Sequence, residues 1–272
     1  MEILGRHREM AGEEYHYGAG KYALSKGGLD RLNRSVLHYN EQKVERSEPT
    51  PAMAVGTAFH ANTLEPDRFC DQVAVAPSVD RRTKKGKQDL EDFALSANGK
   101  AVISEQDMER VRDMTAACLA HDSARALLRN GAAENSFFWQ IGDTLCKCRP
   151  DYLREDAHVI VDLKSTTDAS FKAFQRSCVN YRYYVQAAWY IDGVNDVLGA
   201  GTVDSFVIIA VESAPPYGVA VYAFDEIAVD VGRRQAAADM QKLLDYNAQP
   251  EAERYAGYDR SIQEMYLPSW VE

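Results

Sequence analysis

The sequence has no long apolar run, no linker-like composition and no internal repeat. Its longest strongly apolar run, Phe206 to Val211, is far too short to span a bilayer, and the opening MEILGRHREM lacks the apolar core of a signal peptide. No Pro/Ser/Gly-rich stretch divides the 272 residues. These absences predict a cytoplasmic protein that does not enter a membrane and that folds as a single domain over residues 25–272.

Cysteine and net positive charge are scarce as well. The five cysteines stand at scattered positions, 70, 118, 146, 148 and 178, which indicates a reducing compartment rather than a disulfide framework. Cys146 and Cys148 lie two apart on a predicted strand, but no second pair completes a zinc site, so we interpret them as structural. The net charge of −10 excludes a protein that coats nucleic acid with its whole surface, although a local basic channel stays compatible with it.

Hydrophobic periodicity predicts an α/β domain with a central mixed β-sheet flanked by helices. Residues 1–24 are polar, so we expect there an N-terminal arm or a flexible lead. Ser25 and Ser104 are predicted helix caps. Helices are expected at 25–37, 51–66, 104–131, 169–178, 182–198 and 225–246, and strands at 72–76, 136–141, 144–153, 157–164, 203–211 and 218–224.

Residues 149–164, RPDYLREDAHVIVDLK, concentrate acidic and basic side chains on two predicted strands. Alternation over 157–164 places Asp162 and Lys164 on one face, with their side chains roughly 7 Å apart. A hairpin would bring Asp151, at the end of the preceding strand, beside Asp162. Two carboxylates with a nearby lysine suit a hard divalent cation such as Mg²⁺. The alternative is that these are ordinary charges on an exposed strand face. The opposite face would carry Val159, Val161 and Leu163.

Three further features bear on such a site. His60 follows Gly56 by four residues on a predicted helix, as either a packed core histidine or a ligand. Gln186 and Tyr190 are also four apart and share a helix face. The run RRTKKGK carries five positive charges in seven residues, and it is either a loop that meets phosphates or a solvated loop. Its basic residues are Arg81, Arg82, Lys84, Lys85 and Lys87.

Taken together, these segments resemble the PD-(D/E)xK nuclease superfamily. RPD, the DLK of VIVDLKST after ten intervening residues, and QAAWY match its motif and the QxxxY element of its recombination exonucleases. GTAFHANTLEP, VAPSVDRRTKKGK, CKCRPD, DLKSTTD, YRYYVQAAWY and the terminal LPSW further resemble the nuclease domain of the RecE (exonuclease VIII) family. The likeness runs from about residue 25 to residue 270. The second acid is Asp162, where a glutamate is more common in the superfamily.

This resemblance implies a restriction-endonuclease-like core and assigns roles to site residues. The implied metal ligands are His60, Asp151, Asp162 and the backbone carbonyl of Leu163. The implied catalytic set is Asp151, Asp162, Lys164, Gln186 and Tyr190, in which the last two help to place the scissile strand. We expect DNA contacts from Gln186, Tyr190 and the five basic residues between 81 and 87.

The resemblance also implies an activity and partners. It implies Mg²⁺-dependent, processive 5′-to-3′ degradation of one strand of duplex DNA from a free end, which leaves a 3′ single-stranded tail for recombination by strand annealing. Mn²⁺ is expected to substitute for Mg²⁺, with one or two ions per site. A ring-shaped homo-oligomer, a tetramer by resemblance, would enclose the DNA, and a RecT-like annealing protein would be its partner.

Other functions remain open on these residues. The same core serves structure-specific and restriction-type endonucleases, and a catalytically silent DNA-binding clamp would retain the fold. Asp151, Asp162 and Lys164 together favour an enzyme, because a silent clamp has no chemical need for all three. Iron–sulfur nucleases of the superfamily need four cysteines, and the cysteine spacing here does not provide them. Cleavage of linear against circular duplex DNA distinguishes these functions.

Overall fold

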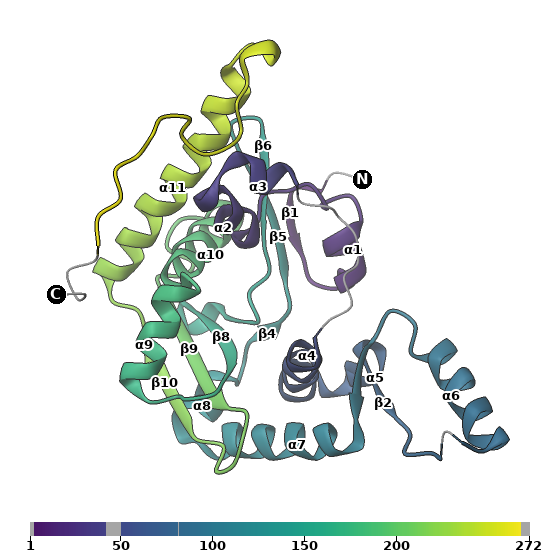
Figure 1. Cartoon of the computed structure of the whole chain (residues 1–272). Coiled ribbons are helices and arrows are strands. Elements are labelled where there is room, and N and C mark those ends of the chain that lie inside the picture. The colour runs from purple at the N-terminus through teal and green to yellow at the C-terminus, as the bar shows by residue number, and fades with distance from the viewer. Residues whose placement is uncertain (1–2, 42–49, 81, 268–272) are drawn as a thin grey trace.

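The computed structural model describes residues 3–41, 50–80 and 82–267 (Figure 1). Its largest sheet has five strands in the order β10-β9-β8-β7-β4. These strands are β4 (Ala132–Ala133), β7 (Tyr152–Arg154), β8 (Val159–Thr166), β9 (Ser205–Glu212) and β10 (Val219–Ala223). The β8–β9 pair is parallel and the other pairs are antiparallel. The predicted mixed sheet is therefore confirmed.

A second sheet has three strands in the order β1-β5-β6. They are β1 (Gly5–His7), β5 (Ser136–Ile141) and β6 (Thr144–Cys148), and β5 turns into β6 at Gly142 and Asp143. The predicted strand 144–153 is split, because the chain leaves β6 after Cys148 and joins the larger sheet as β7. Pro150 lies in the gap, where its missing N–H cannot take part in a ladder.

The two sheets are joined by two neighbouring crossings. One crossing, residues 134–135, leads from β4 to β5, and the other, residues 149–151, leads from β6 back to β7. Because β4 pairs with β7 and β5 pairs with β6, the crossings run side by side as a two-stranded ribbon. A third, separate pair is formed by the parallel strands β2 (Val73–Ala76) and β3 (Ala101–Ser104).

Helices cover both faces of the five-stranded sheet. One apolar core joins Ile160 and Ile208 to α2 (Lys26–Arg34), α10 (Tyr183–Leu198) and α11 (Glu226–Ala248). The other core joins Val159, Val161 and Leu163 to α4 (Pro51–Leu64) and α7 (Glu105–Ala120), as the alternation along β8 predicts. In the part of the chain that the structure describes, no helix is both long and apolar enough to cross a membrane.

The remaining helices are short or peripheral. They are α1 (Gly12–Tyr17), α3 (Val36–Asn40), α5 (Phe69–Gln72), α6 (Lys84–Ser96), α8 (Asp122–Leu127) and α9 (Phe171–Asn180), with 3₁₀ turns at Pro66–Arg68, Glu155–Ala157 and Glu251–Glu253. Ser25 and Ser104 cap α2 and α7 as predicted. Two predicted helices end early, because Ser35 and His121 adopt extended backbone and cap new helices, α3 and α8.

The first residues are not the loose arm that their polar composition suggests. β1 pairs with β5, and Tyr15 is buried against Phe138. Lys147 lies 4.3 Å and the Arg149 guanidinium 4.2 Å from the centroid of the Tyr15 ring. Lys147 also donates a hydrogen bond of 2.8 Å to the Tyr15 carbonyl. Strand pairing and the contacts of one aromatic ring with two cations therefore attach this segment to the folded body, which composition alone does not reveal.

The basic run, expected as a loop, begins a helix. Thr83 caps α6 by accepting a hydrogen bond from the Gly86 N–H. Gly86 is required there, since a Cβ atom would lie 2.1 Å from the Asp80 carbonyl oxygen. Arg81 lies outside the described residues, as do most of the terminal LPSW residues. In Figure 1, α6 projects from the body of the molecule beyond β2.

Candidate active site

Two acidic residues meet where β7 pairs with β8. Tyr152 lies opposite Val161 in this antiparallel pair. Continuing the register by one residue places Asp151, just before Tyr152, opposite Asp162, just after Val161. Asp151 accepts a hydrogen bond of 2.8 Å from the N–H of Leu163 through Oδ2. The two carboxylates therefore lie beside each other, as the hairpin predicts.

Asp162 is fully buried and engaged by two side chains. Gln186 on α10 donates a hydrogen bond of 2.6 Å to Oδ1, and the Lys164 ammonium forms an ion pair with Oδ2. Burial raises the pKa of Asp162 to about 6, Lys164 opposes that rise and Asp151 adds to it. Burial alone would lower the pKa of Lys164, but the two carboxylates hold this pKa above its usual range, so the lysine is a cation.

A second group of ligand-type side chains lies beside this pair. His60, Glu134 and Asp151 each offer one ligand atom, and the three atoms lie within 4.8 Å of one another. His60 Nδ1 is 3.5 Å from Asp151 Oδ2. His60 lies on α4. One turn earlier on this helix, at Gly56, α4 comes close to β8, since a Cβ atom added to Gly56 would lie 3.7 Å from the Ser165 hydroxyl oxygen.

Glu134 was not identified from the sequence. It lies on the crossing from β4 to β5 in the left-handed backbone region, with φ +51°, and its N–H donates a hydrogen bond of 3.1 Å to the Asp151 carbonyl. Burial, together with the Asp151 charge, raises the pKa of Glu134 to about 8. The signal was available: continuing the hairpin register three residues beyond the Phe137–Cys148 pair places Glu134 opposite Asp151.

The three-residue group fits a hard divalent cation. Two carboxylates and one imidazole are ligands that such ions accept, and a cation would offset the burial and the Asp151 repulsion that together raise the pKa of Glu134. Asp162 is not one of these three residues; Gln186 donates to its Oδ1, and its Oδ2 pairs with the Lys164 ammonium but has no hydrogen-bond partner among the described residues. Leu163 reaches the site through its N–H, and a ligand role for its carbonyl stays a prediction.

Tyr190 lies near the acidic centre, where the charges of Asp162 and Asp151 add to the effect of burial on its pKa, whereas the basic run lies on another element. Tyr190 follows Gln186 by one turn of α10 and packs against Phe206, with ring centroids 6.2 Å apart. Burial holds the pKa of Tyr190 well above its usual value, so the phenol is neutral. Arg82 pairs with Asp80 on the exposed surface. Lys84, Lys85 and Lys87 are exposed on the first turn of α6, a helix that Figure 1 shows well apart from β8.

The fold and this cluster of residues match a PD-(D/E)xK-type core. The chain belongs to the family described as a PDDEXK-like domain of unknown function (DUF3799), which matches residues 28–262. No curated protein gives a significant match.

Two solved structures resemble the chain to different degrees. The crystal structure of a "Putative exonuclease" from Eubacterium rectale aligns over 96% of both chains, with a TM-score of 0.62 and 13% identity, and therefore shares the fold. The crystal structure of SSO0001 covers 78% of this chain and 85% of that one, at 9% identity and a TM-score of 0.28, which is too weak to support a structural conclusion.

Proposed function

We propose that this protein is a divalent-metal-dependent deoxyribonuclease that degrades one strand of linear duplex DNA from a free 5′ end. The observation that carries the proposal is the placement of the Asp162–Lys164 ion pair beside the group formed by His60, Glu134 and Asp151. Phosphodiester hydrolysis requires that negative charge developing on phosphate be neutralised, and this site places a cationic lysine and cation ligands together.

The residues divide into those that would hold an ion and those that would act on the phosphate. His60, Glu134 and Asp151 would hold Mg²⁺, with Mn²⁺ as a substitute, and Asp162 and the Leu163 carbonyl would extend this ligand set to one or two ions. A bound ion would supply Lewis-acid polarisation of a phosphoryl oxygen. As a ligand, His60 would be neutral at the nitrogen that it offers.

Lys164 and Gln186 would contribute to the reaction without binding the ion. Lys164 stays protonated between the acidic residues and so presents a positive charge where phosphate charge develops. Gln186 fixes the orientation of the Asp162 carboxylate through its amide hydrogen bond. Tyr190 supports this helix face from its packed position on Phe206 and helps to place the scissile strand.

The first turn of α6 would contact the DNA backbone. Lys84, Lys85 and Lys87 stand at the positive end of the helix dipole, where cations are unfavourable unless an anion offsets them. In a ring-shaped tetramer, these turns would line the central channel together with Arg81 and Arg82. A protein of net charge −10 could then hold DNA in a channel that is locally positive. The 3′ tail that remains would be handed to a RecT-like annealing protein.

Cleavage of end-labelled linear duplex and of closed circular duplex, with Mg²⁺ or with EDTA, tests the proposal. We expect loss of the linear substrate from its 5′ ends, intact circles and no reaction in EDTA. Asp151→Asn is expected to abolish cleavage without unfolding, because an amide oxygen still accepts the Leu163 N–H. Asp67→Asn, an exposed acid on another segment, is the matched control.

Two results would contradict the proposal. Nicked circles would identify an endonuclease, and binding without loss of either substrate would identify a DNA clamp. Wild-type rates in Asp151→Asn would remove this cluster from the active site.

A further inference from the structure

Two stacked tyrosine rings lie next to the Lys164 ammonium. Lys164 Nζ is 5.1 Å from the centroid of the Tyr183 ring, and the Tyr183 and Tyr181 rings stack with centroids 5.6 Å apart and planes at 23°. Tyr183 is half-buried, whereas Tyr181 is 61% exposed. The stack therefore leads outward from the acidic centre to an aromatic face that is open to solvent.

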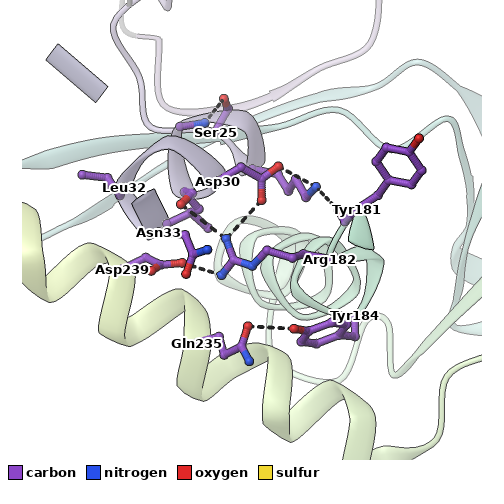
Figure 2. Close-up of polar contacts among 12 residues, drawn as sticks. Ser25, Asp30, Leu32, Asn33, Tyr181, Arg182, Tyr184, Gln235 and Asp239 are labelled. Carbon is purple, nitrogen blue, oxygen red and sulfur yellow. Dashed lines mark hydrogen bonds and ion pairs between the residues drawn. The ribbon is translucent and has the colours of Figure 1, made fainter. Parts of the chain in front are cut away.

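The backbone between the two rings is held in an unusual conformation. Arg182, between them, adopts φ +54° and ψ +45°, a left-handed conformation that is uncommon for arginine. Its guanidinium donates to Asp30 on α2 and to Asp239 on α11. Figure 2 shows the Tyr181 ring pointing away from this network, while Tyr184, two residues after Arg182, hydrogen-bonds to Gln235.

The backbone of Tyr181 and the ring of Tyr183 are each held by a further contact. The Lys26 ammonium donates to the Tyr181 carbonyl. The Tyr183 ring packs against Phe174, with centroids 6.2 Å apart, and Phe174 is buried and stacks in turn on Tyr222 at 5.3 Å. A side chain held in this way loses little conformational freedom when a planar ligand stacks on it.

We propose that Tyr181, supported by Tyr183, is a stacking subsite for the nucleobase of a nucleotide next to the scissile phosphate. This inference rests on the proposed nuclease function, which places the phosphate at Lys164. An exposed aromatic face one ring beyond that lysine fits a base rather than a phosphate or sugar. Every base has a π face, so the subsite would hold the end of the degraded strand without reading its sequence.

Substrates with missing bases test the subsite. One duplex is intact, and three others each carry one abasic site, at the first, second or third nucleotide of the degraded strand. The kcat/KM for cleavage of each duplex is measured with Mg²⁺. The wild type is expected to lose about tenfold or more when the stacked base is absent. Tyr181→Ala should lose about as much on the intact substrate and nothing further on that abasic substrate, and Tyr181→Phe should behave as wild type.

Tyr258→Ala is the matched control, because Tyr258 is 59% exposed and contacts another ring, that of His38, on a segment away from the site. A second measurement needs no cleavage: 2-aminopurine at the same nucleotides should be quenched on binding by the wild type and not by Tyr181→Ala.

The outcomes separate the two proposals. If the wild type cleaves but Tyr181→Ala keeps the full effect of the missing base, the subsite is wrong and the nuclease stands. If the wild type cleaves no DNA, the nuclease proposal fails, and the fluorescence alone decides: quenching that requires Tyr181 supports base stacking, and its absence overturns it.

Discussion

Single residues in this protein carry more than one task, and Arg182 is the clearest case. Its side chain is buried, it bridges α2 and α11 through Asp30 and Asp239, and its backbone turns the chain into α10 (Figure 2). Asp239 is itself buried and also accepts a hydrogen bond from Lys242. The loop before α10 is thus fixed by ion pairs to α2 and α11.

Replacing Arg182 should destabilise the fold strongly. Arg182→Ala leaves Asp239 buried with only Lys242, and we expect a loss of about 3 kcal/mol in the free energy of unfolding. Arg233→Ala, which breaks exposed pairs with Asp192 and Asp230, should cost no more than about 1 kcal/mol. Urea denaturation measures both, and equal losses would contradict a structural role for the buried pair.

Glu134 should control the affinity for the metal ion. Glu134→Gln keeps the size of the side chain and removes one anionic ligand, so we expect the Mg²⁺ concentration for half-maximal cleavage to rise by about tenfold or more. Glu105→Gln, an exposed acid at the start of α7, is the control. An unchanged Mg²⁺ requirement in Glu134→Gln would show that this residue is not a ligand.

At the scale of elements, sequence patterns predicted most strands and helices, because each buries one regular face. The acids at 151 and 162 followed from the hairpin between two predicted strands. Glu134 was missed because it lies outside the predicted strands, in a left-handed backbone conformation, and only the hairpin register continued beyond strand 136–141 places it opposite Asp151. The docking of Tyr15 depends on Lys147 and Arg149, which are more than a hundred residues away, and such contacts leave no local signature.

The basic first turn of α6 makes its own prediction. Replacing Lys84, Lys85 and Lys87 with glutamine should weaken duplex binding and reduce the slope of log affinity against log salt by roughly one for each phosphate that the variant no longer neutralises. Arg112→Gln, an exposed cation on α7, should leave the slope nearly unchanged. The slope is measured by DNA-binding assays at salt concentrations from low to physiological. An unchanged slope in the triple variant would show that these lysines do not contact DNA phosphates.

At the scale of the whole molecule, the site is assembled from distant parts of the chain. α4 supplies His60, the two crossings supply Glu134 and Asp151, β8 supplies Asp162 and Lys164, and α10 supplies Gln186. These parts are separated in sequence, and the packing of helices on both faces of one sheet brings them together.

The proposed ring predicts the mass of the particle in solution. We expect light scattering coupled to size exclusion to give about four times the 30.4 kDa chain mass, since a closed ring is the usual form of a head-to-tail assembly. Addition of duplex DNA should not change the number of subunits. A monomer at micromolar concentration would contradict the ring.

The ribbon that joins the two sheets carries both Glu134 and Asp151, so an ion bound by them would fasten its two crossings to each other and stiffen the connection between the sheets. Metal loading would then be a mechanical event as well as a chemical one. When the ion is bound, backbone amides in β5, β6, β7 and β8 would all exchange their hydrogens with solvent more slowly. Ion binding would therefore be detectable as increased rigidity at positions far from the nucleic acid.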